Sequence, residues 1–203
     1  MGMLDEVAAV PALRAGLEAA ARNQGGPGAD GVSVAAFAAQ SHHELDRLRD
    51  ELLTGAWRPR PALQRRIPKP GGGHRLLAIG CVRDRVVQHA VAQTLARRFD
   101  SILHPSAYAW RPGRSAQQCL AAVDAALAEG QHWVFRGDIA DFFDTIPHAL
   151  LLETLRDHTG DEALVALVEH LLLAGTLVGG DIVDPALGTG QGSPLSPFLA
   201  NLY

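Results

Sequence analysis

The sequence predicts a helix-rich α+β fold with a small antiparallel sheet. Apolar residues recur at spacings of three and four along most of the chain, which is the period of a buried helix face. One Pro/Gly-rich turn separates two short extended runs, which is typical of a hairpin. Hydrophobic residues make up 47% of the 203 residues, enough to bury a sizeable core. We expect a helical N-terminal extension over residues 1–50 and a main domain over 51–203.

The helices follow from this apolar spacing and from capping residues. Ser41 and Ser115 are suitable N-cap residues, and Gly55 marks the end of a helix. A Gly-rich loop at 23–31 separates the first two helices. The expected helices cover residues 3–23, 41–54, 82–99, 115–129, 149–158 and 161–174.

The strands are fewer and shorter. Residues 62–67 and 75–79 look extended, and the Pro68–Gly73 segment between them predicts a hairpin. We expect a further strand from His132 to Asp138, and a Gly/Asp-rich turn at 179–181 that joins two short strands. The chain ends in an apolar run that resembles the start of a helix, so we expect it to stop inside a domain.

The distribution of charge is uneven. The formal net charge is -4, but residues 56–114 hold 12 of the 18 Lys and Arg residues and only Asp84 and Asp100 as acids. A basic stretch inside an acidic chain is typical of a local phosphate-binding surface. The alternative is that these side chains only solvate helix faces, and the charge alone does not separate the two.

Composition excludes several classes of protein. No apolar run reaches about 18 residues, so we expect no membrane span. The acidic pair Asp5 and Glu6 argues against a secretory signal. Cys81 and Cys119 make neither a disulfide framework nor a zinc finger, which favours a reducing cytoplasm with two idle thiols.

An acidic motif runs from Gly137 to Asp144. A predicted strand ends in the carboxylate of Asp138, and Asp141 and Asp144 follow within six residues. Because Mg²⁺ prefers carboxylate oxygens, phosphates and water, this cluster is a candidate magnesium site. Acidic residues at strand ends are also common in ordinary loops, so the motif alone leaves both alternatives open.

A Gly-rich motif runs from Gly188 to Pro197. Two glycines flank Gln191, and Ser193 and Pro194 suit an N-cap and a first helical position. Such a segment can bring the backbone close to a nucleotide, or it can be an ordinary entry into a helix.

Two basic motifs complete the set. Lys69 and Arg75 flank the hairpin turn, where both could reach one phosphate group or could simply be solvated. Aromatic and basic residues alternate from Tyr108 to Ser115, as in a surface that follows a nucleic-acid strand. Trp110 within this motif suits the core equally well.

The order and spacing of these motifs resemble the sequence blocks of reverse transcriptases, especially the bacterial group II intron branch. The resemblance covers about residues 20–203. Its blocks are Asn23 with Gly28-Ala-Asp-Gly31; Arg66-Ile-Pro-Lys with Arg75-Leu-Leu-Ala-Ile; Asp84-Arg-Val-Val-Gln88; Tyr108 with Arg111-Pro-Gly-Arg-Ser115; Asp138 with Phe143-Asp144; and Gln191-Gly-Ser-Pro-Leu-Ser-Pro with Ala200-Asn-Leu-Tyr203.

The resemblance implies an RNA-directed DNA polymerase, with the fingers and part of the palm of a right-hand polymerase. Asp138 would bind two Mg²⁺ ions and the carbonyl of Ile139 would join one of them. The partners would be an RNA template, a DNA or RNA primer and deoxynucleotide triphosphates.

The resemblance also implies roles for other residues. Lys69 and Arg75 would clamp the triphosphate, Phe143 would be the steric gate against ribose, and Gln191 would line the pocket near the sugar. The implied nucleotide-binding residues are Lys69, Arg75, Asp141, Phe143 and Gln191. The implied contacts to template or primer are Arg65, Arg66, Arg111 and Arg114.

The chain departs from the family pattern in two places. Gly190 stands where the family usually has proline, a position at which CRISPR-associated branches are more tolerant. The Tyr-x-Asp-Asp block, expected after Tyr203, is not in this sequence, so we expect a fragment that is inactive alone and lacks the rest of the palm and the thumb. The alternatives are an RNA-binding, maturase-like module and a nonfunctional remnant. The system that the parent enzyme serves stays open.

Overall fold

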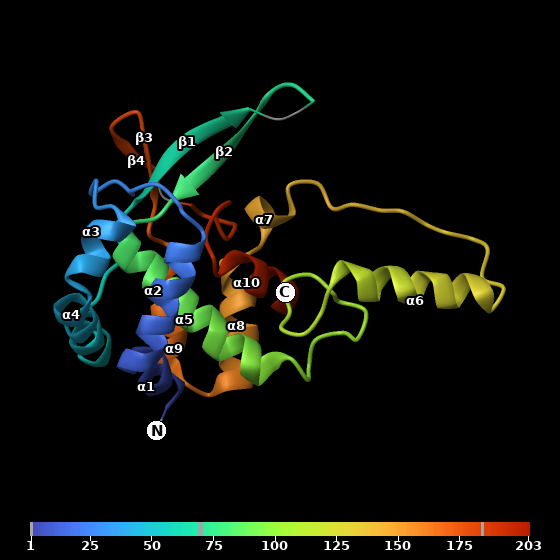
Figure 1. Cartoon of the computed structure of the whole chain (residues 1–203), viewed down its shortest axis with the longest axis horizontal. Coiled ribbons are helices and arrows are strands. Elements are labelled where there is room, and N and C mark those ends of the chain that lie inside the picture. Colours follow the sequence, from blue (N-terminus) through green and yellow to red (C-terminus); the bar gives the residue numbers. More distant parts are fainter. Residues whose placement is uncertain (1, 69–70, 184) are drawn as a thin grey trace.

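A computed structural model describes residues 2–68, 71–183 and 185–203. The helices are α1 (Met3–Ala8), α2 (Val10–Arg22), α3 (Val34–Ala39), α4 (Ser41–Leu53), α5 (Val82–Phe99), α6 (Ala116–Ala128), α7 (Phe142–Thr145), α8 (His148–Thr159), α9 (Glu162–Leu172) and α10 (Ser196–Leu202). The strands are β1 (Ala62–Pro68), β2 (His74–Ile79), β3 (Thr176–Val178) and β4 (Asp181–Val183). Most helices gather into one body, and the β1–β2 hairpin rises over it (Figure 1).

Helix α5 is the centre of the core. Its residues Val86, Val87, Val91 and Leu95 are fully buried, as the apolar spacing of residues 82–99 predicted. Helix α2 packs along it at Gly16, where a Cβ atom would lie under 3.0 Å from the Val86 carbonyl oxygen. Real Cβ atoms essentially never come so close, so the two helices can approach only because this residue has no side chain.

The N-terminal helices belong to the same hydrophobic cluster as α5, α8 and α9. A domain boundary after residue 50 therefore stays a prediction. The single helix predicted over residues 3–23 is wrong, because Ala9 is extended and separates α1 from α2. Pro11 lies in the first turn of α2, where its missing N–H costs nothing, whereas inside a continuous helix it would remove a hydrogen bond.

The sheet is mixed, with strand order β2-β1-β3-β4. The predicted hairpin is confirmed by antiparallel pairing of β1 with β2, and the predicted short strands around residues 179–181 are confirmed by β3 and β4. The small antiparallel sheet that the sequence predicted also contains one parallel pair, because β3 pairs in parallel with β1. The Ala62 N–H donates to the Gly175 carbonyl oxygen over 3.0 Å, which brings two distant parts of the chain together.

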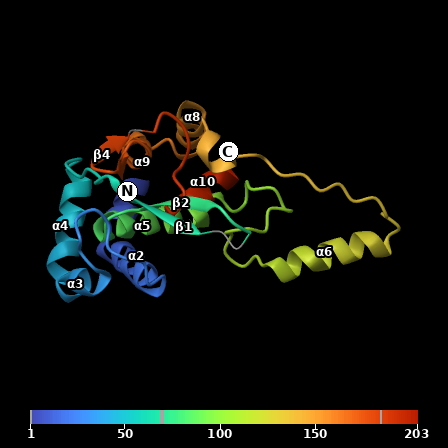
Figure 2. The same ribbon diagram turned by 90° about the horizontal axis from the view of Figure 1, so that it is seen from above.

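Helix α6 and the segment at 131–140 project away from the body in both views (Figures 1 and 2). The predicted capping of α6 is confirmed, since the Ser115 hydroxyl accepts the Gln118 N–H and the Gln118 side chain accepts the Ser115 N–H. No residue of α6 is buried. The predicted strand from His132 to Asp138 is wrong: this stretch is exposed and pairs with no strand among the described residues. A strand needs a partner for its backbone groups, and here none is provided.

Two smaller differences lie at helix starts. Helix α3 was not predicted, and it is capped by the Ser33 hydroxyl, which accepts the Ala36 N–H. The predicted N-cap at Ser193 is wrong, because α10 begins three residues later at Ser196, with Pro197 in its first turn. In the part of the chain that the structure describes, no helix is both long and apolar enough to cross a membrane.

We predict that Gly16→Ala lowers the free energy of unfolding by about 2 kcal/mol, because the new methyl group overpacks against the backbone of α5. Alanine has a higher helix propensity than glycine, and this favours the variant by about 1 kcal/mol, which offsets part of the larger steric cost. Thermal unfolding followed by circular dichroism measures the change. Gly26→Ala is the control, since no atom lies within 4 Å of its added Cβ. An unfolding midpoint at or above that of the wild type would contradict the packing.

Candidate functional site

The segment around Gln191 is joined to the β1–β2 hairpin through backbone atoms. The Ala78 N–H on β2 donates to the Gln191 carbonyl oxygen over 2.8 Å. The next residue, Gly192, has φ +112°, and a Cβ there would lie 2.8 Å from the Ala78 carbonyl oxygen. Glycine is required on both grounds, so the Gly-rich sequence fixes Gln191 beside β2.

The same segment is joined to α7. The Thr189 N–H donates to the Phe143 carbonyl oxygen over 2.8 Å, and the Gly188 N–H donates to Ile146 over 2.8 Å. The Gln191 side chain donates its Nε2–H to Asp144 Oδ2 over 2.9 Å. Three motifs far apart in the sequence therefore meet: the hairpin, the acidic motif and the Gly-rich motif.

Helices α8 and α10 hold the Gly-rich segment from the other side. The Ser196 hydroxyl donates to the carbonyl oxygens of Thr189 and Gly190, the latter at 2.9 Å. His148 Nε2 lies 2.6 Å from the Gly188 carbonyl oxygen. With backbone bonds on both sides, the position of Gln191 is set by the fold and not by its own side chain.

The hairpin borders two cavities, and Arg75, Leu77 and Gln191 belong to the lining of both. The register pairs Arg65 with Leu77 and Ile67 with Arg75, and opposed residues point to the same face. This face borders a groove of about 1070 Å³, which Arg75, Leu77, Phe143 and Gln191 line. Arg66 pairs with Leu76 on the opposite face. The sequence did not separate Arg65 from Arg66, whereas the pleat of the strand does.

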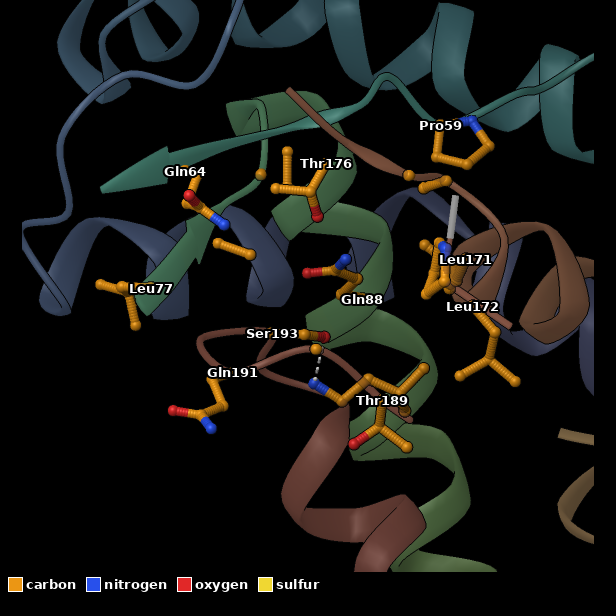
Figure 3. Close-up of a pocket in the computed structure, with 18 of the residues that line it drawn as sticks. Pro59, Gln64, Leu77, Gln88, Leu171, Leu172, Thr176, Thr189, Gln191 and Ser193 are labelled. Atoms are coloured by element: carbon orange, nitrogen blue, oxygen red, sulfur yellow. Dashed lines mark hydrogen bonds between the residues drawn. The ribbon is translucent and has the colours of Figure 1, made fainter. Parts of the chain in front are cut away.

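The opposite face borders a smaller cavity of about 460 Å³ (Figure 3). The side chains of Gln64 on β1, Thr176 on β3 and Gln88 on α5 face the same space. Asp84, one turn before Gln88 on α5, also lines it. Polar side chains from three elements therefore surround a hollow beside the Gln191 segment.

Asp84 is the buried acid of this cavity, with 1% of its surface exposed. Its Oδ2 accepts the Arg60 N–H over 3.0 Å. Its Oδ1 lies 3.5 Å from the Arg83 Nε but has no hydrogen-bond partner among the described residues. Burial raises the pKa of this carboxyl to about 6, more than the Arg60 N–H and the charge of Arg83 lower it.

The arginines of the basic stretch divide into two groups. Arg60 pairs with Asp30, Arg83 with Glu51 and Arg98 with Glu6, and Arg85 donates to the Gly26 carbonyl oxygen. These hold the fold together. Within residues 2–68, 71–183 and 185–203, no salt bridge is found for Arg65, Arg66, Arg75, Arg97 and Arg114. The excess positive charge that remains free lies on the hairpin and around the larger groove.

Arg111 has a structural position. Its guanidinium donates to Asp100 Oδ1 at 2.9 Å and to the carbonyl oxygens of Asp100, His104 and Ala107 at 2.8 to 3.0 Å. The side chain is 3% exposed, so its donors are used within the chain. Arg114 is exposed and lies over the Tyr108 ring at 5.7 Å, which leaves it as the accessible arginine of this motif.

The acidic motif is only partly gathered into the site. Asp144 contacts Gln191, but Asp138 and Ile139 lie on the exposed segment at 131–140 and line neither cavity. Asp141 is exposed in the left-handed region, with φ +49°. Among the described residues, no three His, Cys, Asp or Glu side chains lie close enough to hold a metal ion. Lys69 lies outside the described residues.

Some residues of the site had no predicted role. Asp84 and Gln88 belong to a block that supported the resemblance, but no function was assigned to them. Their spacing of four residues places both on one face of a helix. This spacing is the sequence feature that could have indicated a shared site. His89 on the neighbouring face lines the larger groove. Burial, together with the charges of Arg85 and Arg22, lowers its pKa to about 4.

These three motifs, on a helical body with a small mixed sheet, are the sequence blocks that resemble those of reverse transcriptases. The family model described as reverse transcriptase (RNA-dependent DNA polymerase) matches residues 67–203, so the chain belongs to the reverse transcriptase family. The relatives specify the branch. Protein YkfC of Escherichia coli strain K12 is 36% identical over 180 residues, which cover 87% of this chain and 47% of that protein.

Two further comparisons support the same branch. The group II intron-encoded protein LtrA of Lactococcus lactis is 29% identical over 164 residues, covering 80% of this chain and 27% of that protein. A chain of a partial Cas6-RT-Cas1–Cas2 complex superposes with a TM-score of 0.67 at 26% identity, over the whole of this chain and 34% of that one. The predicted resemblance to group II intron and CRISPR-associated reverse transcriptases is confirmed. The chain spans about half the length of YkfC and less of the other two.

We predict that Asp84→Asn changes how stability depends on pH. A carboxyl whose pKa rises on folding, here from 3.8 to about 6, favours the folded state while it is protonated. Its contribution is complete below its unfolded pKa and is lost as the pH rises through about 6. Wild-type stability should therefore fall, relative to the variant, by on the order of 2 kcal/mol between about pH 4 and pH 7.

Urea unfolding at several pH values measures this difference. His89 titrates in the same range with the opposite sign, but it is present in both proteins and cancels. Asp157→Asn, at an exposed position of α8, is the control. Parallel pH profiles for wild type and Asp84→Asn would show that Asp84 does not titrate in this range.

Proposed function

We propose that this chain is the fingers and first palm part of an RNA-directed DNA polymerase. On this proposal, an RNA template, its primer and the incoming deoxynucleotide bind between the hairpin, α7 and the Gly-rich segment. The convergence of Arg75, Phe143 and Gln191 on one groove supports the proposal, because these residues come from three separate motifs. The family of the chain supports it independently.

Each of the three groups has chemistry suited to a nucleotide. Arg75 is exposed on β2, and its guanidinium can hold a phosphate with two parallel hydrogen bonds. The Phe143 ring offers a bulky apolar wall against which a ribose 2′-hydroxyl would collide. Because the Gln191 Nε2 donates to Asp144, its Oε1 remains available to accept a sugar hydroxyl. Lys69 as a second phosphate ligand stays a prediction.

The described carboxylates do not by themselves fit a two-metal site, since Asp138 stands apart from Asp144 and the cavities. We therefore propose that Asp138 is the metal ligand this chain contributes, with the Ile139 carbonyl beside it, and that Mg²⁺ binding needs further carboxylates. For the chain alone, the function that follows is binding of nucleic acid and nucleotide. Primer extension requires a protein that supplies the remaining ligands.

A second candidate is RNA binding without polymerisation, as in a maturase-like module. Two exposed arginines on the hairpin, Arg65 and Arg66, favour it, since neither forms a salt bridge with any residue that the structure describes. This candidate expects RNA affinity that falls with salt and with neutralised hairpin arginines, but does not depend on Asp138. Because Arg65 shares the groove face and Arg66 does not, Arg65→Gln should weaken binding of a template–primer hybrid more than Arg66→Gln.

Primer extension on an RNA template tests the proposed function. In the protein that carries this chain, we predict that Asp138→Ala abolishes Mg²⁺-dependent extension and leaves affinity for the template–primer hybrid unchanged, because Asp138 lies away from the groove. Asp157→Ala, which removes an exposed acid from α8, should retain extension. Extension that persists in Asp138→Ala would contradict the polymerase proposal. A wild type that binds RNA but does not extend the primer would favour the second candidate.

A further inference from the structure

Trp110 is a large apolar residue that is mostly exposed to solvent. Its side chain is 74% exposed, whereas Trp57 is 2% exposed in the core. Its backbone has φ +56°, in the left-handed region that residues other than glycine rarely adopt. Residues held in such conformations cluster at binding and active sites, where the surrounding structure supports the strain.

The loop that carries Trp110 is fixed on both sides of it. The preceding residue, Ala109, accepts a hydrogen bond from the Asn201 side chain of α10 over 2.8 Å. The following residue, Arg111, is buried and bonded to Asp100, His104 and Ala107. The indole therefore extends from a backbone that is already ordered, so a ligand that contacts it does not have to order this loop.

The groove beside Trp110 combines apolar walls with positive charge. Ala92, Ala96 and Phe198 belong to its lining, and the charged side chains along it are Arg75, Arg97, Arg111 and Arg114, with no acid among the described lining residues. His89 also lines it, with a buried Nε2 that has no hydrogen-bond partner in the described part of the chain. An apolar floor, an exposed indole and free guanidinium groups suit an unpaired nucleotide, whose base stacks while its phosphates meet arginine.

We propose that Trp110 is a stacking platform for an unpaired base of the nucleic-acid strand in this groove. The base lies against the indole face, and the adjoining phosphates contact Arg97 and Arg114. This rests on the proposed function and adds a binding residue to it. An acidic peptide could form ion pairs with the arginines, but its carboxylates would not stack on the flat apolar indole. A nucleotide can do both, so it is the ligand that we propose.

Fluorescence anisotropy with labelled template–primer hybrids tests the platform. One hybrid has a single-stranded RNA overhang on the template, one has a single-stranded DNA overhang on the primer, and one is blunt. Trp110→Ala should weaken binding of an overhang hybrid by about tenfold, the loss expected for one stacked base. The blunt hybrid should bind Trp110→Ala and wild type alike. The overhang that shows the loss identifies the strand that stacks.

Matched variants separate stacking from a general loss of apolar surface. Trp110→Phe keeps an aromatic face and should retain most of the affinity. Trp133→Ala removes an equally large ring, 99% exposed on the segment at 131–140, and should bind as the wild type does. In a Trp133→Phe background, an overhang hybrid should quench the indole fluorescence, and Trp110→Phe should remove that quenching.

The outcomes are distinct. Selective loss for an overhang hybrid in Trp110→Ala, with quenching, supports the platform. Equal binding by Trp110→Ala and wild type overturns the platform and leaves the proposed function in place. Equal losses for blunt and overhang hybrids also overturn it, because the blunt hybrid has no unpaired base. If the wild type binds none of the hybrids, the proposed function and this inference both fail.

Discussion

The backbone hydrogen bond from Ala78 to Gln191 is the contact on which the candidate site depends. It fixes the Gly-rich segment against β2, and Gly192 is the residue that lets the two backbones come so close. On its other side the backbone of the same segment donates to carbonyl oxygens at α7 and contacts the side chains of His148 on α8 and Ser196 on α10. The hairpin, the acidic motif and the Gly-rich motif are therefore aligned by main-chain atoms. Gln191 and Asp144 are joined by one side-chain hydrogen bond, which does not use the Gln191 Oε1 or the Asp144 Oδ1.

The arginines of this chain fall into two groups, which is how a chain with a net negative charge can still carry the proposed nucleic-acid surface. Some arginines bind carboxylates and carbonyl groups of the chain itself, as Arg111 does within its own loop. Others, such as Arg65, Arg75 and Arg114, stay exposed near the groove. The net charge of the chain sums the paired and the exposed arginines with all the acids, so it does not indicate the local positive charge around the groove. Trp110 belongs to the same surface, where an indole is presented by a loop that the buried Arg111 holds in place.

Sequence patterns correctly predicted the elements whose structure depends on residues close together in the chain. Helix α5 and the β1–β2 hairpin follow from apolar spacing and turn residues, and both are confirmed. The parallel pairing of β1 with β3 joins segments more than a hundred residues apart, and no local pattern encodes it. The residues of His132–Asp138 favour a strand, but no described strand pairs with them. The local sequence pattern therefore gave a wrong prediction there. The resemblance assigned roles to Arg75, Phe143 and Gln191, which line one groove in the structure, and those roles stay predictions. The burial of Arg111 and Asp84 depends on packing that the sequence does not display.

On the proposed function, the Gly-rich segment docked on β2 forms the nucleic-acid site together with the hairpin. The most direct measurement is the affinity of Gly192→Ala for an RNA template–DNA primer hybrid, compared with Gly71→Ala, whose added Cβ has no atom within 4 Å. A Cβ at position 192 meets the Ala78 carbonyl oxygen in a strained backbone conformation, so the segment should leave β2. We predict that Gly192→Ala loses hybrid affinity by about tenfold or more while the helical core unfolds at its usual temperature. Unchanged affinity in Gly192→Ala would contradict it.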